Sequence, residues 1–167
     1  MIRETSIDNV FLAERDNWYR FAFGMTGSAG DAHDILHDAY ERVRRKSSSS
    51  EISNIRGYLF LTIRNLCFDF VKKEKVKIGL GDDVLECVDS ENSLEKSDEI
   101  QWLHKFLQRL PTAQRSVILL KDIEGYNFDE ISKMLEMNKN NIRVNLSIAR
   151  KKLREAFSTL RSNELKR

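Results

Sequence analysis

The sequence predicts an all-α fold of two small helical domains joined by a flexible acidic linker, with a helix-turn-helix in the second domain. Three observations support this prediction. Apolar residues recur three and four positions apart along most of the 167 residues, which is the spacing of a helix. Few segments alternate apolar and polar residues as a strand does. A run of acidic residues without an apolar period separates the two segments that have the helical spacing. We expect domains at residues 1–77 and 100–167, with the linker at residues 78–99.

The first domain begins with two amphipathic helices. Apolar residues between Ile7 and Phe23 fall on one side of a helix, and Gly24 is expected to end it. A second helix is expected to start near Ser28–Asp31 and to end before the serine run Ser47–Ser50. Its inward-facing residues are predicted to be Ile35, Leu36, Ala39, Tyr40 and Val43.

An exposed loop and a third helix are expected to follow. The stretch from Ser47 to Asn54 has neither an apolar period nor helix formers, so it predicts a loop that ends on Asn54 as an N-cap. The helix over Ile55–Lys73 is apolar nearly all round, which is typical of the centre of a bundle. An alternative stays open for aromatic rings at its start, because exposed rings beside cations such as Arg56 can stack on unpaired bases.

The linker and the start of the second domain are marked by charge and by turn residues. Between Gly79 and Glu99 eight acidic residues stand against the single base Lys96, and no apolar period is present. A helix is expected over residues 100–110, and Pro111 then supplies the first position of another helix. Gly125 is expected to close that helix.

Two helices joined by a tight turn follow Gly125. Asn127 can cap the first of them, with Glu130 placed to reach back to the Asn127 amide. Glu136 and Met137 make the turn, and Asn138 caps the second helix. The buried face of that helix is predicted to hold Ile142, Leu146, Ala149, Leu153 and Phe157. A helix fits the major groove of B-DNA, so its exposed first turns are placed to reach base edges.

The basic residues of the chain gather at its C-terminal end. The formal net charge of the whole chain is only +2, but from Lys139 onward nine basic residues stand against two acidic ones. Such a local excess favours a polyanionic partner, because neutralising phosphates releases counterions. The alternative is an ordinary solvated face of an amphipathic helix.

Several kinds of site are not indicated by the sequence. Cys67 and Cys87 are the only cysteines, too few for a disulfide scaffold or a four-cysteine zinc site, and the three histidines lack further ligands at metal-binding spacing. No glycine-rich phosphate loop is present. We therefore expect that the protein is not an enzyme, has no catalytic residue and binds no metal or cofactor. Without a signal peptide or a long apolar run, we expect a cytoplasmic protein.

Three blocks in order resemble the extracytoplasmic-function (ECF) sigma factors of bacterial RNA polymerase, over nearly everything from Phe11 to Phe157. The block DILHDAYERV at residues 34–43 is similar to the helix that docks on the polymerase clamp. The block RGYLFLTIRNLCFD at residues 56–69 resembles the promoter-melting helix with its arginine-asparagine pair. The third block joins LPTAQR, DIEG and ARKKLRE between residues 110 and 155, and looks like the domain that reads the minus-thirty-five element.

The resemblance implies a set of contact residues on each domain. Polymerase-binding residues are expected at Asp34, Ile35, His37 and Asp38. Contacts with the minus-ten element are expected from Ser49, Ser50, Asn54, Arg56, Tyr58, Arg64, Asn65, Asp69, Lys72 and Lys73. Contacts with the minus-thirty-five element are expected from Arg115, Asn138, Lys139, Asn140, Asn141, Arg143, Val144, Ser147 and Lys151. The loop Ser47–Asn54 would accept a base flipped out of the minus-ten element, because a stacked base hides its pairing edge.

The chain departs from the family pattern at four positions. His37 stands where the family usually has glutamine, and Tyr58 stands where it usually has tryptophan. Asn145 and Ile148 occupy positions that often carry arginine, so the upstream sequence preference is expected to differ from that of a typical member. The acidic linker falls where family linkers approach the RNA exit path, so it either mimics nucleic acid or is a solvated tether.

The resemblance implies that core RNA polymerase and promoter DNA are the partners, and allows an anti-sigma protein as a third. No stretch approaches the length of an apolar membrane span, so we expect no direct insertion into a membrane. Two other functions remain open. A DNA-binding regulator that acts without polymerase would use the same second domain, with a first domain devoted to dimerisation or signal sensing. Such a regulator would have no need of the Asp34 block or the arginine-asparagine helix. A helical adaptor that binds protein alone would have no need of the basic C-terminal end.

Overall fold

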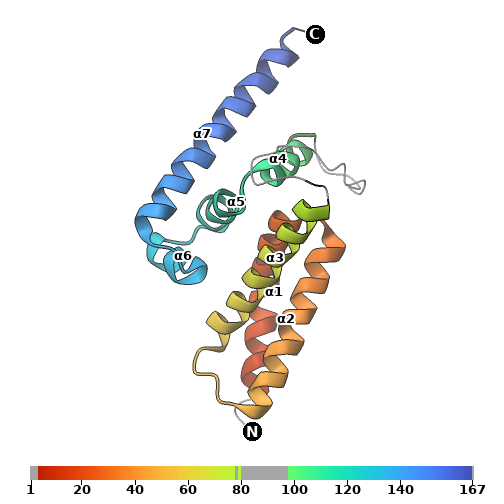
Figure 1. The fold of residues 1–167 in the computed structure, drawn as a ribbon, viewed down its shortest axis with the longest axis vertical. Coiled ribbons are helices and arrows are strands. Elements are labelled where there is room, and N and C mark those ends of the chain that lie inside the picture. Colours follow the sequence, from red (N-terminus) through yellow and green to blue (C-terminus); the bar gives the residue numbers. More distant parts are fainter. Residues whose placement is uncertain (1–3, 78, 80–97, 167) are drawn as a thin grey trace. The chain divides into compact units, whose positions relative to one another are not determined.

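The structure is a computed structural model that describes residues 4–77, 79 and 98–166, and within them it contains helices and no strands. The predicted all-α class is therefore confirmed. The elements are α1 (Glu4–Thr26), α2 (Ala29–Ser49), α3 (Ile55–Lys77), α4 (Asp98–Arg109), α5 (Thr112–Ile118), the π-helical turn η1 (Leu119–Ile123), α6 (Phe128–Leu135) and α7 (Lys139–Glu164). They form two compact units, Met1–Arg109 and Leu110–Arg167. Figure 1 labels the α-helices.

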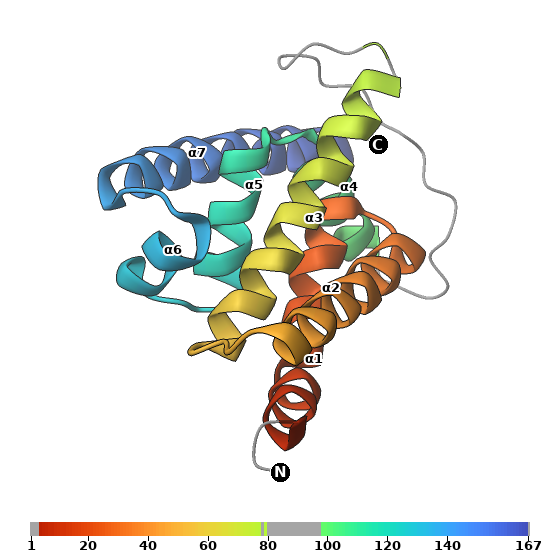
Figure 2. The same ribbon diagram turned by 60° about the horizontal axis from the view of Figure 1, so that its bottom comes forward.

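The first unit is built on α1, α2 and α3, which lie side by side in Figures 1 and 2. The rings of Phe21 and Phe60 meet at the centre with centroids 5.1 Å apart. Trp18, Leu59 and Ile63 are fully buried around them. Burial of α3 on several sides agrees with the prediction that this helix is the centre of a bundle.

Two helix ends in this unit differ from the prediction. Gly24 lies buried inside α1, and the helix continues to Thr26, where Gly27 with φ +73° breaks it. Helix α2 does not end before the serine run but continues to Ser49. The serine hydroxyls donate back to the carbonyls of Arg44 and Lys46, at 2.8 and 3.1 Å for the first and 3.0 and 3.2 Å for the second. The helix thus continues through the serine run, and the loop is shorter than predicted.

Helix α4 belongs to the first unit, which differs from the predicted domain boundary near residue 100. The side chain of Gln108 donates to the carbonyl of Gly24 over 2.9 Å, and the His104 ring meets the Phe23 ring edge-on with centroids 4.7 Å apart. These contacts fix α4 on the C-terminal end of α1 and move the boundary to Leu110. Asp98 and Glu99, predicted as the end of the linker, form the first turn of α4, and linker residues 80–97 lie outside the described part of the chain.

The second unit holds the predicted helix-turn-helix. Pro111 precedes α5 as its N-cap and not as its first residue. Helix α7 contacts α5 and α6 through its buried residues Ile142, Leu146 and Ala149. Beyond Ala149 no described residue of α7 is fully buried, and the predicted Leu153 is half-buried. The prediction that Phe157 is buried is wrong, because 42% of it is exposed. None of the described helices combines the length and the apolar character that crossing a bilayer requires.

Candidate nucleic-acid interface

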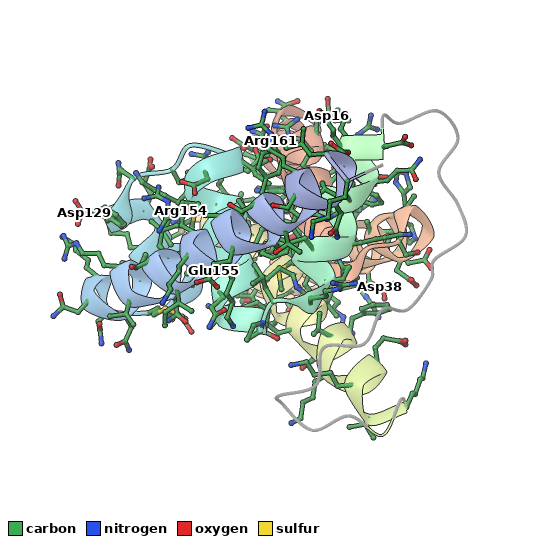
Figure 3. The ribbon with its side chains drawn as sticks, turned by 90° about the horizontal axis from the view of Figure 1, so that it is seen from above. Asp16, Asp38, Asp129, Arg154, Glu155 and Arg161 are labelled. Atoms are coloured by element: carbon green, nitrogen blue, oxygen red, sulfur yellow. The ribbon has the colours of Figure 1, made fainter. Side chains whose placement is uncertain are left out.

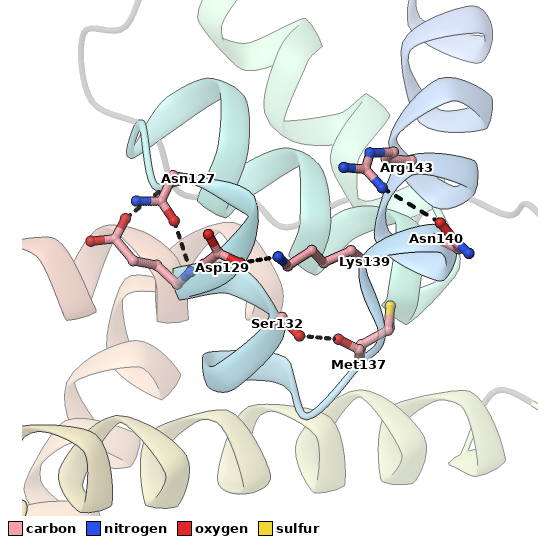
Figure 4. A network of polar contacts seen from close by, with 8 residues as sticks. Asn127, Asp129, Ser132, Met137, Lys139, Asn140 and Arg143 are labelled. Atoms are coloured by element: carbon pink, nitrogen blue, oxygen red, sulfur yellow. Dashed lines mark hydrogen bonds and ion pairs between the residues drawn. The ribbon is translucent and has the colours of Figure 1, made fainter.

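The turn between α6 and α7 is fixed by side-chain caps. The Asn127 side chain accepts the Glu130 amide and the Glu130 carboxylate accepts the Asn127 amide, each over 2.9 Å. Glu136 turns the chain with φ +53°, and the Ser132 hydroxyl donates to the Met137 carbonyl over 2.7 Å. Asn138 then accepts the Asn141 amide over 2.8 Å. Figure 4 shows the capping bonds of Asn127 and the bond between Ser132 and Met137. Both predicted caps and the predicted turn are confirmed.

The first turns of α7 present an exposed polar face, as the sequence predicts. Its exposed members include Asn140, Asn141, Arg143, Val144 and Ser147. The Arg143 guanidinium lies over the Phe128 ring, 5.1 Å from its centroid, and donates to the Asn140 side chain over a long 3.4 Å. This face is open to solvent, and its amide, guanidinium and hydroxyl groups are the chemistry that reads base edges.

Ion pairs join α7 to the neighbouring elements. Lys139 pairs with Asp129 of α6, and this hydrogen bond is the largest cause that lowers the pKa of the Asp129 carboxyl. The Arg150 guanidinium donates two hydrogen bonds, of 2.9 and 2.6 Å, to the Asp122 carboxylate of η1, and these bonds raise the pKa of Arg150. Lys151 stays exposed, with Glu155 4.0 Å away on the same helix. Lys151 is therefore better placed than Arg150 to meet a phosphate.

The far half of α7 carries charge on more than one side. Arg154 and Glu155 leave the helix in different directions, and Arg161 lies further along it (Figure 3). Arg150, Lys151 and Lys152 are consecutive, and successive residues of a helix point about 100° apart, so the basic residues do not form one narrow stripe.

Arg115 does not fit its predicted contact with DNA. Its side chain is buried in the second unit, and Nη2 donates to the Leu110 carbonyl over 3.0 Å. Burial lowers the pKa of the guanidinium to about 10. Arg115 thus ties the start of α5 to the preceding turn and does not face solvent.

The predicted polymerase-docking residues on α2 divide into two sets. Asp34, His37 and Asp38 are exposed on one side of the helix. Ile35 is only 7% exposed and faces the core, as its predicted inward position requires, and its contact with polymerase stays a prediction. The physical reason is helix geometry, because neighbouring residues on an amphipathic helix point to different sides.

The loop before α3 gathers several of the predicted minus-ten residues. Ser49 and Ser50 are exposed at the end of α2. The Asn54 side chain accepts the Gly57 amide over 2.9 Å, which confirms the predicted cap. Tyr58 accepts a hydrogen bond of 2.7 Å from Lys46, whose ammonium also lies 4.5 Å from the ring centre, and Arg56 pairs with Glu14 at 3.0 Å.

Further along α3 an exposed stripe is separated from a buried arginine. Asn65, Asp69, Lys72 and Lys73 are exposed and recur at the spacing of one helix face. Arg64 is only 7% exposed and donates to the Asn65 side chain through Nε at 3.1 Å and Nη2 at 2.6 Å. Arg64 therefore orients Asn65, and its own contact with DNA stays a prediction.

Three functional candidates were missed at the sequence level: Lys46, Asp122 and Phe128. Each contacts a partner that lies twelve or more positions away in the sequence, such as Arg143 for Phe128. The spacing of apolar residues along one helix does not predict such a pair.

Family comparisons match both units in the same order. The model described as Sigma-70 region 2 matches residues 10–76, and the model described as Sigma-70 region 4 matches residues 100–153. The second match begins inside α4, which the structure packs on the first unit.

Curated relatives extend the match along the chain. The ECF RNA polymerase sigma factor SigM of Bacillus subtilis is 23% identical over 156 residues, which span 92% of this chain and 96% of that protein. The RNA polymerase sigma factor SigV of the same organism is 25% identical over 145 residues, or 84% of each chain. The probable ECF sigma factor SigI of Mycobacterium tuberculosis is 26% identical over 166 residues, which span 93% of this chain but 57% of that relative.

Solved structures share the fold. The sigma factor RpoE in complex with the anti-sigma factor NepR from Bartonella quintana aligns with a TM-score of 0.72 at 23% identity, over 92% of this chain and 98% of that one. CnrH in complex with the cytosolic domain of CnrY aligns with a TM-score of 0.69 at 16% identity, over 94% and 90%. With both sigma-70 regions present in order and ECF sigma factors matched along nearly the whole chain, the protein belongs to the ECF sigma factors of RNA polymerase.

Proposed function

We propose that this sigma factor docks on core RNA polymerase through the exposed acids of α2 and directs it to promoters by reading two DNA elements. The first unit would read and melt the minus-ten element, and the second would anchor on the minus-thirty-five element. The observation that carries the proposal is the exposed first-turn face of α7, held by two caps on a chain that also carries a sigma-70 region 2.

The second unit supports reading of duplex DNA. Asn138 caps α7, so the helix N-terminus and the groups of Asn140, Arg143 and Ser147 are presented at one exposed end. Phosphates are favoured near a helix N-terminus, and guanidinium and amide groups read base edges in the major groove. Lys151 would add a contact with the DNA backbone that carries no sequence information.

The first unit supports capture of an unpaired base. Tyr58 is half-buried beside the short loop that follows α2. The Lys46 ammonium lies 4.5 Å from its ring centre, and Arg56 stands two residues before it in α3. An aromatic ring flanked by cations suits a stacked base whose phosphates need neutralising. Asn65 and Asp69 lie one helical turn apart on α3 and offer hydrogen-bonding groups to the edge of such a base.

Sigma factors are transcription initiation factors and not enzymes, so RNA synthesis would remain the work of the polymerase. We further infer that the protein acts in the cytoplasm, where bacterial polymerase works, and binds an anti-sigma protein, as RpoE does with NepR. Pull-down of the tagged chain from its native cells, followed by identification of its partners, tests both polymerase and anti-sigma binding.

Co-elution with purified core polymerase on a sizing column tests the docking step. The full chain is expected to move to the elution volume of the core enzyme, and footprints of the mixture are expected to span both promoter elements. A DNA-binding regulator that acts without polymerase would instead footprint one element without core enzyme and would not co-elute with it.

A further inference from the structure

Phe128 lies where three elements of the helix-turn-helix unit meet. It is the first residue of α6, directly after the cap Asn127, and it is half-buried. Two cations from other elements lie over its ring: Lys121 Nζ of η1 at 4.7 Å from the centroid, and the Arg143 guanidinium of α7 at 5.1 Å. The negative face of an aromatic ring attracts such cations.

The ring contact fixes a side chain that otherwise has room to move. Arg143 lies on the wall of an open hollow of about 310 Å³, whose lining also includes Phe128, Ser147, Arg150 and Arg154. Its hydrogen bond to Asn140 is long, at 3.4 Å. An arginine has many rotamers, and ordering it on DNA costs entropy unless its free form is already held.

Phe128 itself is held in place. The capping box fixes the backbone of Asn127 immediately before it. Lys121, the other cation on the ring, also donates to the Tyr126 carbonyl over 3.3 Å, which links the ring to the turn before α6. The orientation of the ring is thus set by the fold of the motif and not by the DNA.

We propose that Phe128 is a positioning residue for DNA recognition: its ring holds the Arg143 guanidinium ready to contact a base, and so sets sequence preference without touching DNA. This inference rests on the proposed function of α7. An exposed cation–π contact corresponds to about a two- to fivefold effect on binding.

The test is binding of the holoenzyme to duplexes selected from a random library by the wild-type holoenzyme. The base pair that Arg143 reads is identified as the one whose preference is relaxed by Arg143→Ala. Phe128→Leu removes the π face and keeps apolar bulk, whereas Phe128→Tyr keeps the ring and is the matched control.

Phe128→Leu is expected to lower affinity for the preferred duplex about two- to fivefold, to leave non-specific binding and its salt slope unchanged, and to add no loss on the Arg143→Ala background. Phe128→Tyr is expected to retain wild-type preference. A merely structural ring would give additive losses in the double variant, or equal losses on every duplex together with a lower melting temperature, and either result overturns the proposal. If the wild-type holoenzyme selects no sequence at all, the proposed function fails and this inference fails with it.

Discussion

Arg143 and Lys151 lie on the same helix but should contribute differently to DNA binding. Arg143→Ala is predicted to cost about 1–3 kcal/mol on the preferred upstream element and to relax preference at one base pair. Lys151→Ala is predicted to weaken binding to all sequences alike and to reduce the salt slope by about one. Anisotropy titrations of both variants at several salt concentrations measure these effects. Equal losses on every sequence for both variants would contradict the assignment of Arg143 to base reading.

Arg115 is predicted to serve the fold and not the DNA. Arg115→Met removes a buried charge and also the donor to the Leu110 carbonyl, so two opposing effects leave the free energy of unfolding within about 1–2 kcal/mol of the wild type. The salt slope of DNA binding should not change, because no phosphate contact is lost. If Arg115→Met reduced the salt slope of DNA binding by about one, Arg115 would contact a phosphate and this prediction would be wrong.

The Asp129–Lys139 pair makes a pH prediction. In the folded chain the pKa of the Asp129 carboxyl lies below its ordinary value because Lys139 stabilises the ionised form. Its contribution to stability is therefore present above the unfolded-state pKa and is lost as pH falls through the folded one. NMR titration of Asp129 should show a pKa that returns toward the ordinary value in Lys139→Met. An unchanged pKa in that variant would show that another group causes the shift.

Residues that act locally could be predicted from the sequence, and residues that act across the fold could not. The caps Asn127 and Asn138 were predictable because capping depends on neighbours two or three residues away. Arg64 and Arg115 were expected to contact DNA because their motif blocks resemble those of the family, and a charged side chain is normally exposed. Only the packing around them reveals that they are buried.

Among the elements, the start of α3 depends on a glycine. A Cβ at Gly57 would lie 2.7 Å from Asn54 Nδ2, so Gly57→Ala forces the capping side chain to move. At Gly30 in α2 the nearest atom to an added Cβ is 3.9 Å away, which makes Gly30→Ala a matched control. Replacing glycine by alanine favours the helix equally at both positions, so this gain cancels when the two variants are compared. The remaining difference is the disturbed Asn54 cap, so the free energy of unfolding of Gly57→Ala in urea denaturation should be about 1 kcal/mol lower than that of Gly30→Ala. Equal stability of the two variants would show that the Asn54 cap contributes nothing.

Helix existence was predictable and helix ends were less so. The apolar period predicted seven α-helices in the described part of the chain, and these are present. The apolar period does not show that Gly24 fits inside α1, or that α2 continues through serines whose hydroxyls bond back to its carbonyls. The π-helical turn η1 had no sequence signal, since its apolar residues fit an ordinary helix equally well.

At the scale of the whole molecule, the partner of an amphipathic helix is the property that the sequence hides. Helix α4 has a clear apolar side, with Phe106 and Leu107 buried, but that side does not identify the surface it covers. Proximity in sequence suggested the second domain, whereas the contacts of His104 and Gln108 place α4 on α1. The sigma factor identity did not depend on this boundary, because the three motif blocks lie on other elements.

The central claim is that one chain both docks on polymerase and directs it to a promoter. Run-off transcription with purified core polymerase tests it most directly, using wild-type protein, the double variant Asp34→Ala with Asp38→Ala, and Asp16→Ala as a control at an exposed acid of α1 (Figure 3). We predict a transcript of defined start with the wild type and with Asp16→Ala, and none with the double variant, which should remain folded because both acids are exposed. No specific transcript with the wild type, or full activity of the double variant, would contradict the account.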